Sequence, residues 1–423
     1  MTVGESKRGL PAEPATYRSL FSERQFTALF IAQAISLTGD QLARVAIATL
    51  VFKETGSAFV TALIYAVTYV PWLVGGPLLG GLADRLPRRT VMVCCQLTSA
   101  VLVALMALPG MPLIALAALL FVVILAESPF LSARASLLVD VLPDDRYVLA
   151  SALNQLTIQA AQVVGFAVGG GLIRLIGPRD ALLVDAVTFL VSAVLVRFGV
   201  RVHGAVASVV QLGNSWERMK TGAKVVFGDP RLRGLVLLGW LATFWVVPEG
   251  LAAPYAKGDA TSIGLLLASQ PIGSVVGGVV LSRMVRPVTR LELMGWLAVL
   301  SCLPLVFFFT TPPLPVAVAL LVISGIGTTY NLPANAAFMQ ALPAERRGQA
   351  FGLVSAGLVA GQGISIAVAG ACAELTSPGV VIGVAGLLGV AAALSLSAAV
   401  TFTCGAGSSP PGGPIQRTTL PSS

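Results

Sequence analysis

Residues 80–89 read GGLADRLPRR and lie between two apolar runs, residues 60–79 and 90–108. Each run has about 20 residues, and a helix of that length crosses roughly 30 Å of hydrocarbon. The stretch between the runs combines two glycines, the carboxylate of Asp84 and a cluster of arginines. A charged turn between two such runs predicts a loop that joins two membrane-spanning helices.

The composition of the whole chain agrees with this prediction. Of the 423 residues, 56% are hydrophobic and 11% are charged, and the mean hydropathy is +0.87. Soluble domains carry about 25% charged residues. The apolar runs are continuous, whereas the strands of an outer-membrane barrel alternate over segments of ~10 residues. The predicted fold class is therefore an all-α polytopic membrane protein.

Apolar runs recur along the chain and predict twelve transmembrane helices. The predicted spans are residues 26–51, 57–80, 90–109, 113–137, 148–174, 180–200, 233–255, 262–284, 291–310, 314–338, 349–373 and 378–402.

Two sequence landmarks repeat and indicate two six-helix halves. LPDDR at 142–146 precedes the fifth span, LPAER at 342–346 precedes the eleventh, and GVVLSR at 278–283 is a weaker copy of the opening stretch. Transporters that move around a central site are often built from such repeats. The expected organisation is a polar N-terminus (1–25), a first half (26–200), a connecting loop with an amphipathic helix (201–232), a second half (233–402) and a disordered tail (403–423).

Basic residues gather on one side of the predicted spans. The opposite side holds only Lys53, Arg174, Arg179 and Lys257. Lys and Arg accumulate in cytoplasmic loops, so both termini are expected in the cytoplasm. The net charge of +8 does not indicate nucleic-acid binding, because these residues lie in short loops rather than on one face.

The residues that enzymes and metal sites need are scarce. The only histidine, His203, lies outside the predicted spans, and none of the five cysteines has a ligand spacing with it. The chain also lacks the GxxxxGK[ST] loop that binds ATP phosphates. We therefore expect no enzyme activity, no metal and no cofactor.

The opening stretch closely matches the G-x-x-x-D-R-x-G-R-R motif between the second and third helices of major facilitator superfamily transporters, with Pro87 in place of the second glycine. The resemblance covers residues ~20–402 and implies a twelve-helix carrier that works by alternating access. It further implies that this loop latches the two halves in the outward-facing state, whereas a plain positive-inside cluster is the simpler alternative. The latch candidates are Gly80, Asp84, Arg85, Arg88, Arg89 and Arg134.

Other segments resemble the bacterial branch with macrolide-efflux and enterobactin-exporter-like proteins. These are ISLTGD at 35–40, ASALNQ at 150–155 and VVFGDPRLR at 225–233. The resemblance implies export of a small apolar or amphiphilic compound in exchange for protons, by a monomer in the bacterial inner membrane. Uptake of a metabolite and a transport-inactive sensor or scaffold are the alternatives.

The fifth span contains GFAVGGG at 165–171, which resembles the G-P-x-x-G-G signature of proton-coupled drug exporters with Phe166 in place of the proline. Close helix packing alone would also explain these glycines. The residues concerned are Gly165, Gly169 and Gly170.

Acidic residues within the spans are the candidates for proton coupling, because a charge in the bilayer is costly and usually functional. Asp40 and Arg44 are four residues apart and share a helix face. They form either a static salt bridge or a protonation switch. Glu127 precedes Pro129, and Glu249 lies between Pro248 and Gly250, which suggests a broken helix. Asp185 lies near a predicted helix end, so a structural role is expected.

Neutral polar and aromatic residues on the predicted central helices are candidates to line a substrate pathway, although helix–helix hydrogen bonds would equally explain them. They are Gln33, Tyr65, Asn154, Gln159, Trp245, Gln270, Asn331, Asn335 and Gln362.

Overall fold

A computed structural model describes residues 17–79, 86–142, 144–201, 223–224, 226–342 and 347–405. Over these ranges the regular structure is helical, with no strands. Twelve helical segments are long and apolar enough to cross a bilayer. The predicted all-α fold with twelve transmembrane helices is therefore confirmed.

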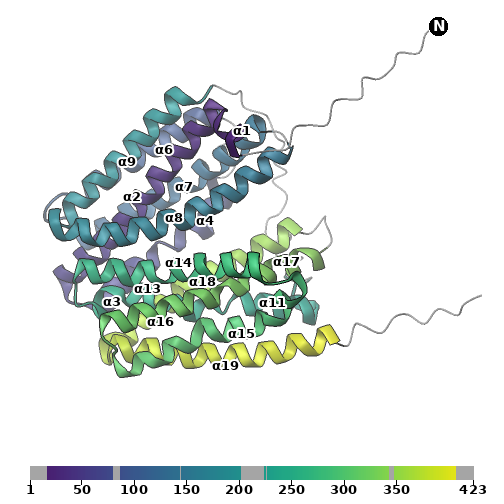
Figure 1. The fold of residues 1–423 in the computed structure, drawn as a ribbon. Helices are drawn as coiled ribbons and strands as arrows, with labels where there is room; N and C mark the ends of the chain where they lie inside the picture. Colours follow the sequence, from purple (N-terminus) through teal and green to yellow (C-terminus); the bar gives the residue numbers. More distant parts are fainter. Residues whose placement is uncertain are drawn as a thin grey trace, which may run out of the picture.

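The helices form two bundles, which we call the N-half and the C-half (Figure 1). The helices of the N-half are α1 (Tyr17–Phe21), α2 (Arg24–Thr55), α3 (Ala58–Val67), α4 (Val70–Leu79), α6 (Arg88–Met106), α7 (Leu113–Val141), α8 (Asp144–Ile176) and α9 (Pro178–Gly199).

The C-half repeats this plan with more interruptions. Its elements are α11 (Pro230–Gly239), α12 (Ala242–Trp245), α13 (Val247–Tyr255), α14 (Ala260–Met284), α15 (Pro287–Val306), the 3₁₀ helix η1 (Phe307–Thr310), α16 (Leu314–Gly327), the 3₁₀ helix η2 (Thr328–Tyr330), α17 (Asn331–Ala341), α18 (Arg347–Leu375) and α19 (Pro378–Gly405).

Several spans are interrupted. The second breaks between α3 and α4, and the seventh is divided into α11, α12 and α13. The ninth ends in η1, and the tenth passes through η2. Pro248 occupies the first turn of α13, where its missing N–H removes no helical hydrogen bond. The predicted break beside Glu249 is therefore present.

The helix ends form two groups, which we name the tight end and the basic end. The tight end holds the turns at residues 56–57, 177, 256–259 and 376–377. Glycine provides the left-handed backbone there, with φ of +64° at Gly56 and +78° at Gly258. The basic end holds the starts of α2, α6 and α11, with Arg24, Arg88 and Arg231 among its basic residues.

The two halves pack against each other toward the tight end. At the crossing of α8 and α14 the backbones come so close that a Cβ on Gly170 would meet the carbonyl of Ala260, and one on Gly264 would meet the carbonyl of Phe166. On α18, Gly370 faces Ala62 of α3. The bundles diverge toward the basic end (Figure 1). Small residues thus allow the contact that holds the halves together at one end.

Candidate functional site

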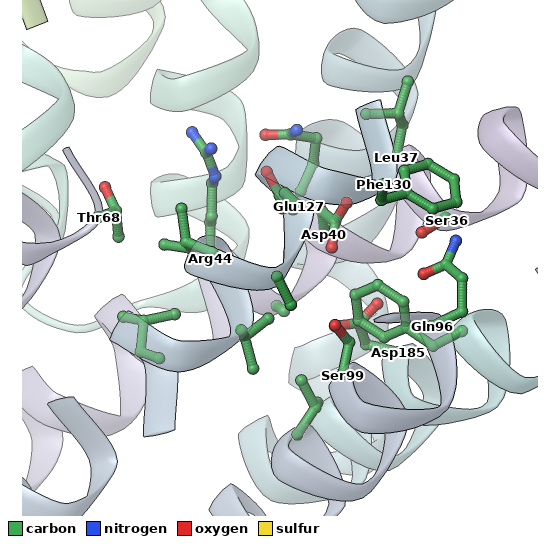
Figure 2. Close-up of a pocket in the computed structure, with 18 of the residues that line it drawn as sticks. Ser36, Leu37, Asp40, Arg44, Thr68, Gln96, Ser99, Glu127, Phe130 and Asp185 are labelled. Carbon is green, nitrogen blue, oxygen red and sulfur yellow. The ribbon is translucent and has the colours of Figure 1, made fainter. Parts of the chain in front are cut away.

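A cavity of about 260 Å³ lies inside the N-half. Its walls come mainly from α2, α6, α7 and α9, with Thr68 and Trp72 from the second span and Ile158 and Gln162 from α8. Most of the lining is apolar, but four charged side chains line the same space (Figure 2). The position of this cavity within one half, rather than between the halves, was not expected from the sequence.

The charged lining consists of Asp40 and Arg44 of α2, Glu127 of α7 and Asp185 of α9. Asp40 and Glu127 lie within electrostatic range of each other, and Asp185 is a further acidic neighbour of Asp40. No group of three His, Cys, Asp or Glu side chains in the described ranges is arranged to hold a metal ion. The three carboxylates line one cavity and influence one another electrostatically, so proton binding at one affects proton binding at the others.

Asp185 is the member of this group for which the sequence suggested only a structural role. Its side chain is 1% exposed, and the Thr188 hydroxyl donates to its Oδ1 over 3.1 Å. Gly39 makes the approach possible, since a Cβ at that position would meet both Asp185 and Thr188. Asp185 lies two turns inside α9, and the sequence signal that could have identified it is an acid within an apolar span.

Two buried amides add hydrogen-bond acceptors to the cavity. The Oε1 atoms of Gln33 and Gln41 are buried and have no hydrogen-bond partner among the described residues. Gln96, by contrast, donates to the Ser192 hydroxyl over 2.6 Å. Because buried polar atoms are normally paired, the two free oxygens are suited to water or to a donor on a ligand.

Glu249 does not line this cavity. It belongs to α13 of the C-half, and the hydroxyl of Tyr65, on α3 of the N-half, donates to its Oε2 over 3.0 Å. The structure therefore brings Asp40, Arg44 and Glu127 together and leaves the fourth coupling candidate at the contact between the halves.

The neutral pathway candidates are dispersed. Gln33 lines the cavity. Gln159 donates to Ser274 across the halves over 3.3 Å, and Gln270 donates to the carbonyl of Trp245 over 2.9 Å within the C-half. Asn331 donates to the carbonyl of Thr328 over 3.1 Å.

The remaining candidates differ in exposure. Asn154 has a buried Oδ1 without a partner in the described structure, Asn335 is exposed and Gln362 is half-buried. These residues do not converge on one cavity.

The glycines of the fifth span lie at helix contacts. Gly165 faces Thr38 and Gln41 of α2, Gly169 faces Leu42, and Gly170 faces α14 of the other half. Close backbone approach accounts for all three positions.

The predicted latch is only partly visible. Gly80, Asp84 and Arg85 lie outside the described residues. Arg88 forms an ion pair with Asp140 of α7, and Arg89 donates to the carbonyl of Val200 over 3.3 Å. Arg134 is 5% exposed, and its Nε has no partner in the described part of the chain.

Comparison with known proteins identifies the family. The model of the Major Facilitator Superfamily matches residues 29–253 and 241–416. The MFS-type transporter YvqJ of Bacillus subtilis is 26% identical over 62% of this chain and 65% of its own length.

Two relatives have names that refer to efflux. Macrolide efflux protein A of Streptococcus pyogenes is 24% identical over 61% of this chain and 66% of its own length. The chain thus spans slightly less than two thirds of this relative and of YvqJ. Multidrug efflux pump Tap of Mycolicibacterium fortuitum is 25% identical over 79% of this chain and 86% of its own length.

Solved structures share the fold. The nucleoside transporter NupG superposes with a TM-score of 0.68 at 14% identity, over 88% of this chain and 98% of that one. A bacterial homologue of the iron transporter ferroportin, in its inward-facing state, gives a TM-score of 0.66 at 15% identity, over 92% and 99%. This chain therefore belongs to the Major Facilitator Superfamily, a family of membrane transporters and not of enzymes.

Proposed function

We propose that this protein exports a small apolar or amphiphilic compound from the cytoplasm in exchange for protons, by alternating access. The observation that carries the proposal is the N-half cavity, in which Asp40, Glu127 and Asp185 share a mid-membrane space with one cation, Arg44. Ionisable groups at this depth are costly and usually mark proton or substrate pathways.

The chemistry of the cavity suits a proton-coupled step. A buried carboxylate that binds a proton loses its charge, and the free energy needed to keep it out of water then decreases. The neighbouring guanidinium of Arg44 then loses one attractive partner. Proton binding therefore changes both the charge of the cavity and the interactions of Arg44, and such a change can bias two conformations of the halves.

The arrangement of the halves supports loading from the cytoplasm. The excess of Lys and Arg at the basic end favours a cytoplasmic location for that end and for both termini. The contacts between the halves lie toward the tight end, which would then be the outer end. A carrier in this conformation is closed to the outside and receives its substrate from the cytoplasm or the inner leaflet.

The direction of transport rests on the relatives. Macrolide efflux protein A and Tap, whose names refer to efflux, support export. The apolar walls of the cavity, which include Phe130, Met106 and Trp72, support an apolar or amphiphilic substrate. We further propose that the protein is a monomer in the bacterial inner membrane.

The test is transport of a panel of fluorescent and antibiotic compounds in proteoliposomes, with and without an imposed pH gradient. We expect gradient-dependent movement toward the acidic side, and loss of that dependence in the Asp40→Asn variant. Asp180→Asn is the matched control, because Asp180 is an exposed carboxylate in the first turn of α9. Movement indifferent to the gradient would overturn proton coupling, and co-movement of substrate with protons would indicate uptake.

A further inference from the structure

Arg44 lies on the boundary between two cavities. It lines the 260 Å³ cavity with Asp40 and Glu127, and it also lines a smaller one of about 20 Å³ with Tyr65 and Thr68. Figure 2 shows its side chain between Thr68 on one side and the carboxylates of Asp40 and Glu127 on the other. Arg44 therefore lines the acidic cavity and also lies next to Tyr65, which contacts the C-half.

Tyr65 and Glu249 connect this boundary to the other half. The Tyr65 ring is 6% exposed and packs with Val246 and Ile366 of the C-half. Its hydroxyl donates to Glu249 over 3.0 Å. Because α13 begins directly after the break in the seventh span, Glu249 lies on a short helix that is not continuous with α11.

The charged and titratable groups within electrostatic range of Arg44 come from several elements. Asp40 is on its own helix, Tyr65 and Tyr69 are on the second span, Glu127 is on α7 and Glu249 is on α13. The ion pairs closer than 4 Å in the described ranges lie elsewhere, at Arg88–Asp140 and Arg179–Glu54. The guanidinium therefore lies between anionic groups of both halves without a close ion pair to either.

We propose that Arg44, Tyr65 and Glu249 form the route by which the state of the N-half cavity reaches the C-half. The inference rests on the proposed function and assigns the roles within it: Asp40 and Glu127 bind the proton, Arg44 changes partner, and Glu249 receives the change across the interface. Glu249 is then a positioning residue and not a proton site of the cavity.

The sign of the effect follows from the charges. When the cavity carboxylates are ionised, they attract Arg44 and weaken its interaction with Glu249. When they are protonated, Glu249 is the remaining anion that faces Arg44, and the attraction across the halves strengthens. Protonation should therefore favour a closed tight end, and deprotonation should favour its opening. This order suits a carrier that returns inward with a proton and moves outward without one.

The experiment measures the distance across the tight end. Spin labels are placed at Ile114, at the start of α7, and at Leu375, at the end of α18, in a variant without native cysteines; these side chains are 86% and 87% exposed. Pulsed electron spin resonance in nanodiscs then gives the closed and open populations at about pH 5.5 and about pH 8.5. For the wild-type background we expect the closed-to-open ratio to be about tenfold higher at the lower pH, a typical allosteric coupling.

Glu249→Gln and Tyr65→Phe should abolish most of this pH response. Tyr255→Phe is the matched control, because the Tyr255 hydroxyl donates to the carbonyl of Pro312 within the C-half over 2.7 Å. It should keep the wild-type response. A full response in Glu249→Gln, or an equal loss in Tyr255→Phe, would overturn the route.

Transport of the same variants separates the two levels of the proposal. If wild-type transport follows the pH gradient but Glu249→Gln keeps the distance response, the route fails and the proposed function stands. If wild-type transport ignores the gradient, the proposed function fails, and the route as a proton-linked device fails with it.

Discussion

The two halves follow one helical plan but have different interiors. The N-half encloses a cavity with Asp40, Glu127 and Asp185. Among the described residues of the C-half core are neutral groups in hydrogen bonds, such as Ser324, whose hydroxyl donates to the carbonyl of Ser301 over 2.6 Å. There, a Cβ on Gly325 would meet the backbone of Gln270.

This difference indicates a division of labour. A hollow, charged interior can change its protonation state, whereas a close-packed neutral one transmits movement as a rigid body. The half-buried Glu249 of the C-half faces Tyr65 of the N-half rather than the interior of its own bundle. Substitutions in the two halves should accordingly fail in different ways.

Glu127→Gln should have the largest effect on transport. The amide keeps the size of the side chain but cannot release a proton, so gradient-driven transport should fall to the level of empty vesicles while the protein stays folded. Transport in proteoliposomes and thermal unfolding measure the two quantities. If the Glu127→Gln variant kept gradient-driven transport at the wild-type rate, the N-half interior would have no proton-binding role that distinguishes it from the C-half.

Gly325→Leu should act mainly on the stability of the protein and less on its transport activity. The added side chain has no space against α14, and overpacking of this kind costs about 1–3 kcal/mol. We expect a lower melting temperature and reduced yield. The matched control is Gly278→Leu on α14, where the structure leaves open space; equal melting temperatures for the two variants would show that the C-half is not closely packed.

Glu374→Ala should have a moderate effect on the contact between the halves. The carboxylate accepts hydrogen bonds from the Ser57 hydroxyl and the Phe59 N–H at the start of α3, each over 3.0 Å. Its loss should raise the open population at the tight end, but less than Glu249→Gln does. The spin-label distances between Ile114 and Leu375 check this order. A larger rise of the open population in Glu374→Ala than in Glu249→Gln would show that the main contact between the halves is the exposed one at Glu374.

Asp259→Ala should have the smallest effect. Asp259 caps α14, and hydrogen bonds from the side chain and backbone of Ser262 hold the pKa of its carboxyl below the usual range. A depressed pKa means that the cap stabilises the fold above the unfolded-state pKa and that this contribution is lost as the pH falls through the folded-state pKa. Removing the cap should cost about 1 kcal/mol at neutral pH.

Thermal unfolding of wild type and Asp259→Ala at neutral and strongly acidic pH checks this prediction. The difference between the two proteins should shrink at acidic pH. A difference that stays constant or grows with acidification would contradict the capping role.

The sequence alone predicted the fold well because length and hydropathy determine it. All twelve spans lie where the apolar runs predicted them, and Pro248 correctly indicated a helix break. The predicted loop motif at residues 80–85 lies outside the described structure.

The composition of the site was harder to predict because it depends on how each helix is rotated and how closely it packs. Asp185 reaches the cavity because Gly39 has no side chain and lets α9 pack closely against α2. Glu249 and Asp40 looked alike as acids within spans, yet Asp40 lines the N-half cavity and Glu249 accepts a hydrogen bond from Tyr65 across the halves. Such differences arise from contacts between residues distant in sequence.

The most direct test of the central claim compares two kinds of transport in the Asp40→Asn variant. Proteoliposomes with the same labelled substrate are assayed for uphill movement under a pH gradient and for one-to-one substrate exchange without a gradient. We predict that uphill movement is lost while exchange is retained, because the substrate still moves but the proton no longer does. Uphill movement at the wild-type rate would contradict this prediction and would remove proton coupling from the N-half cavity.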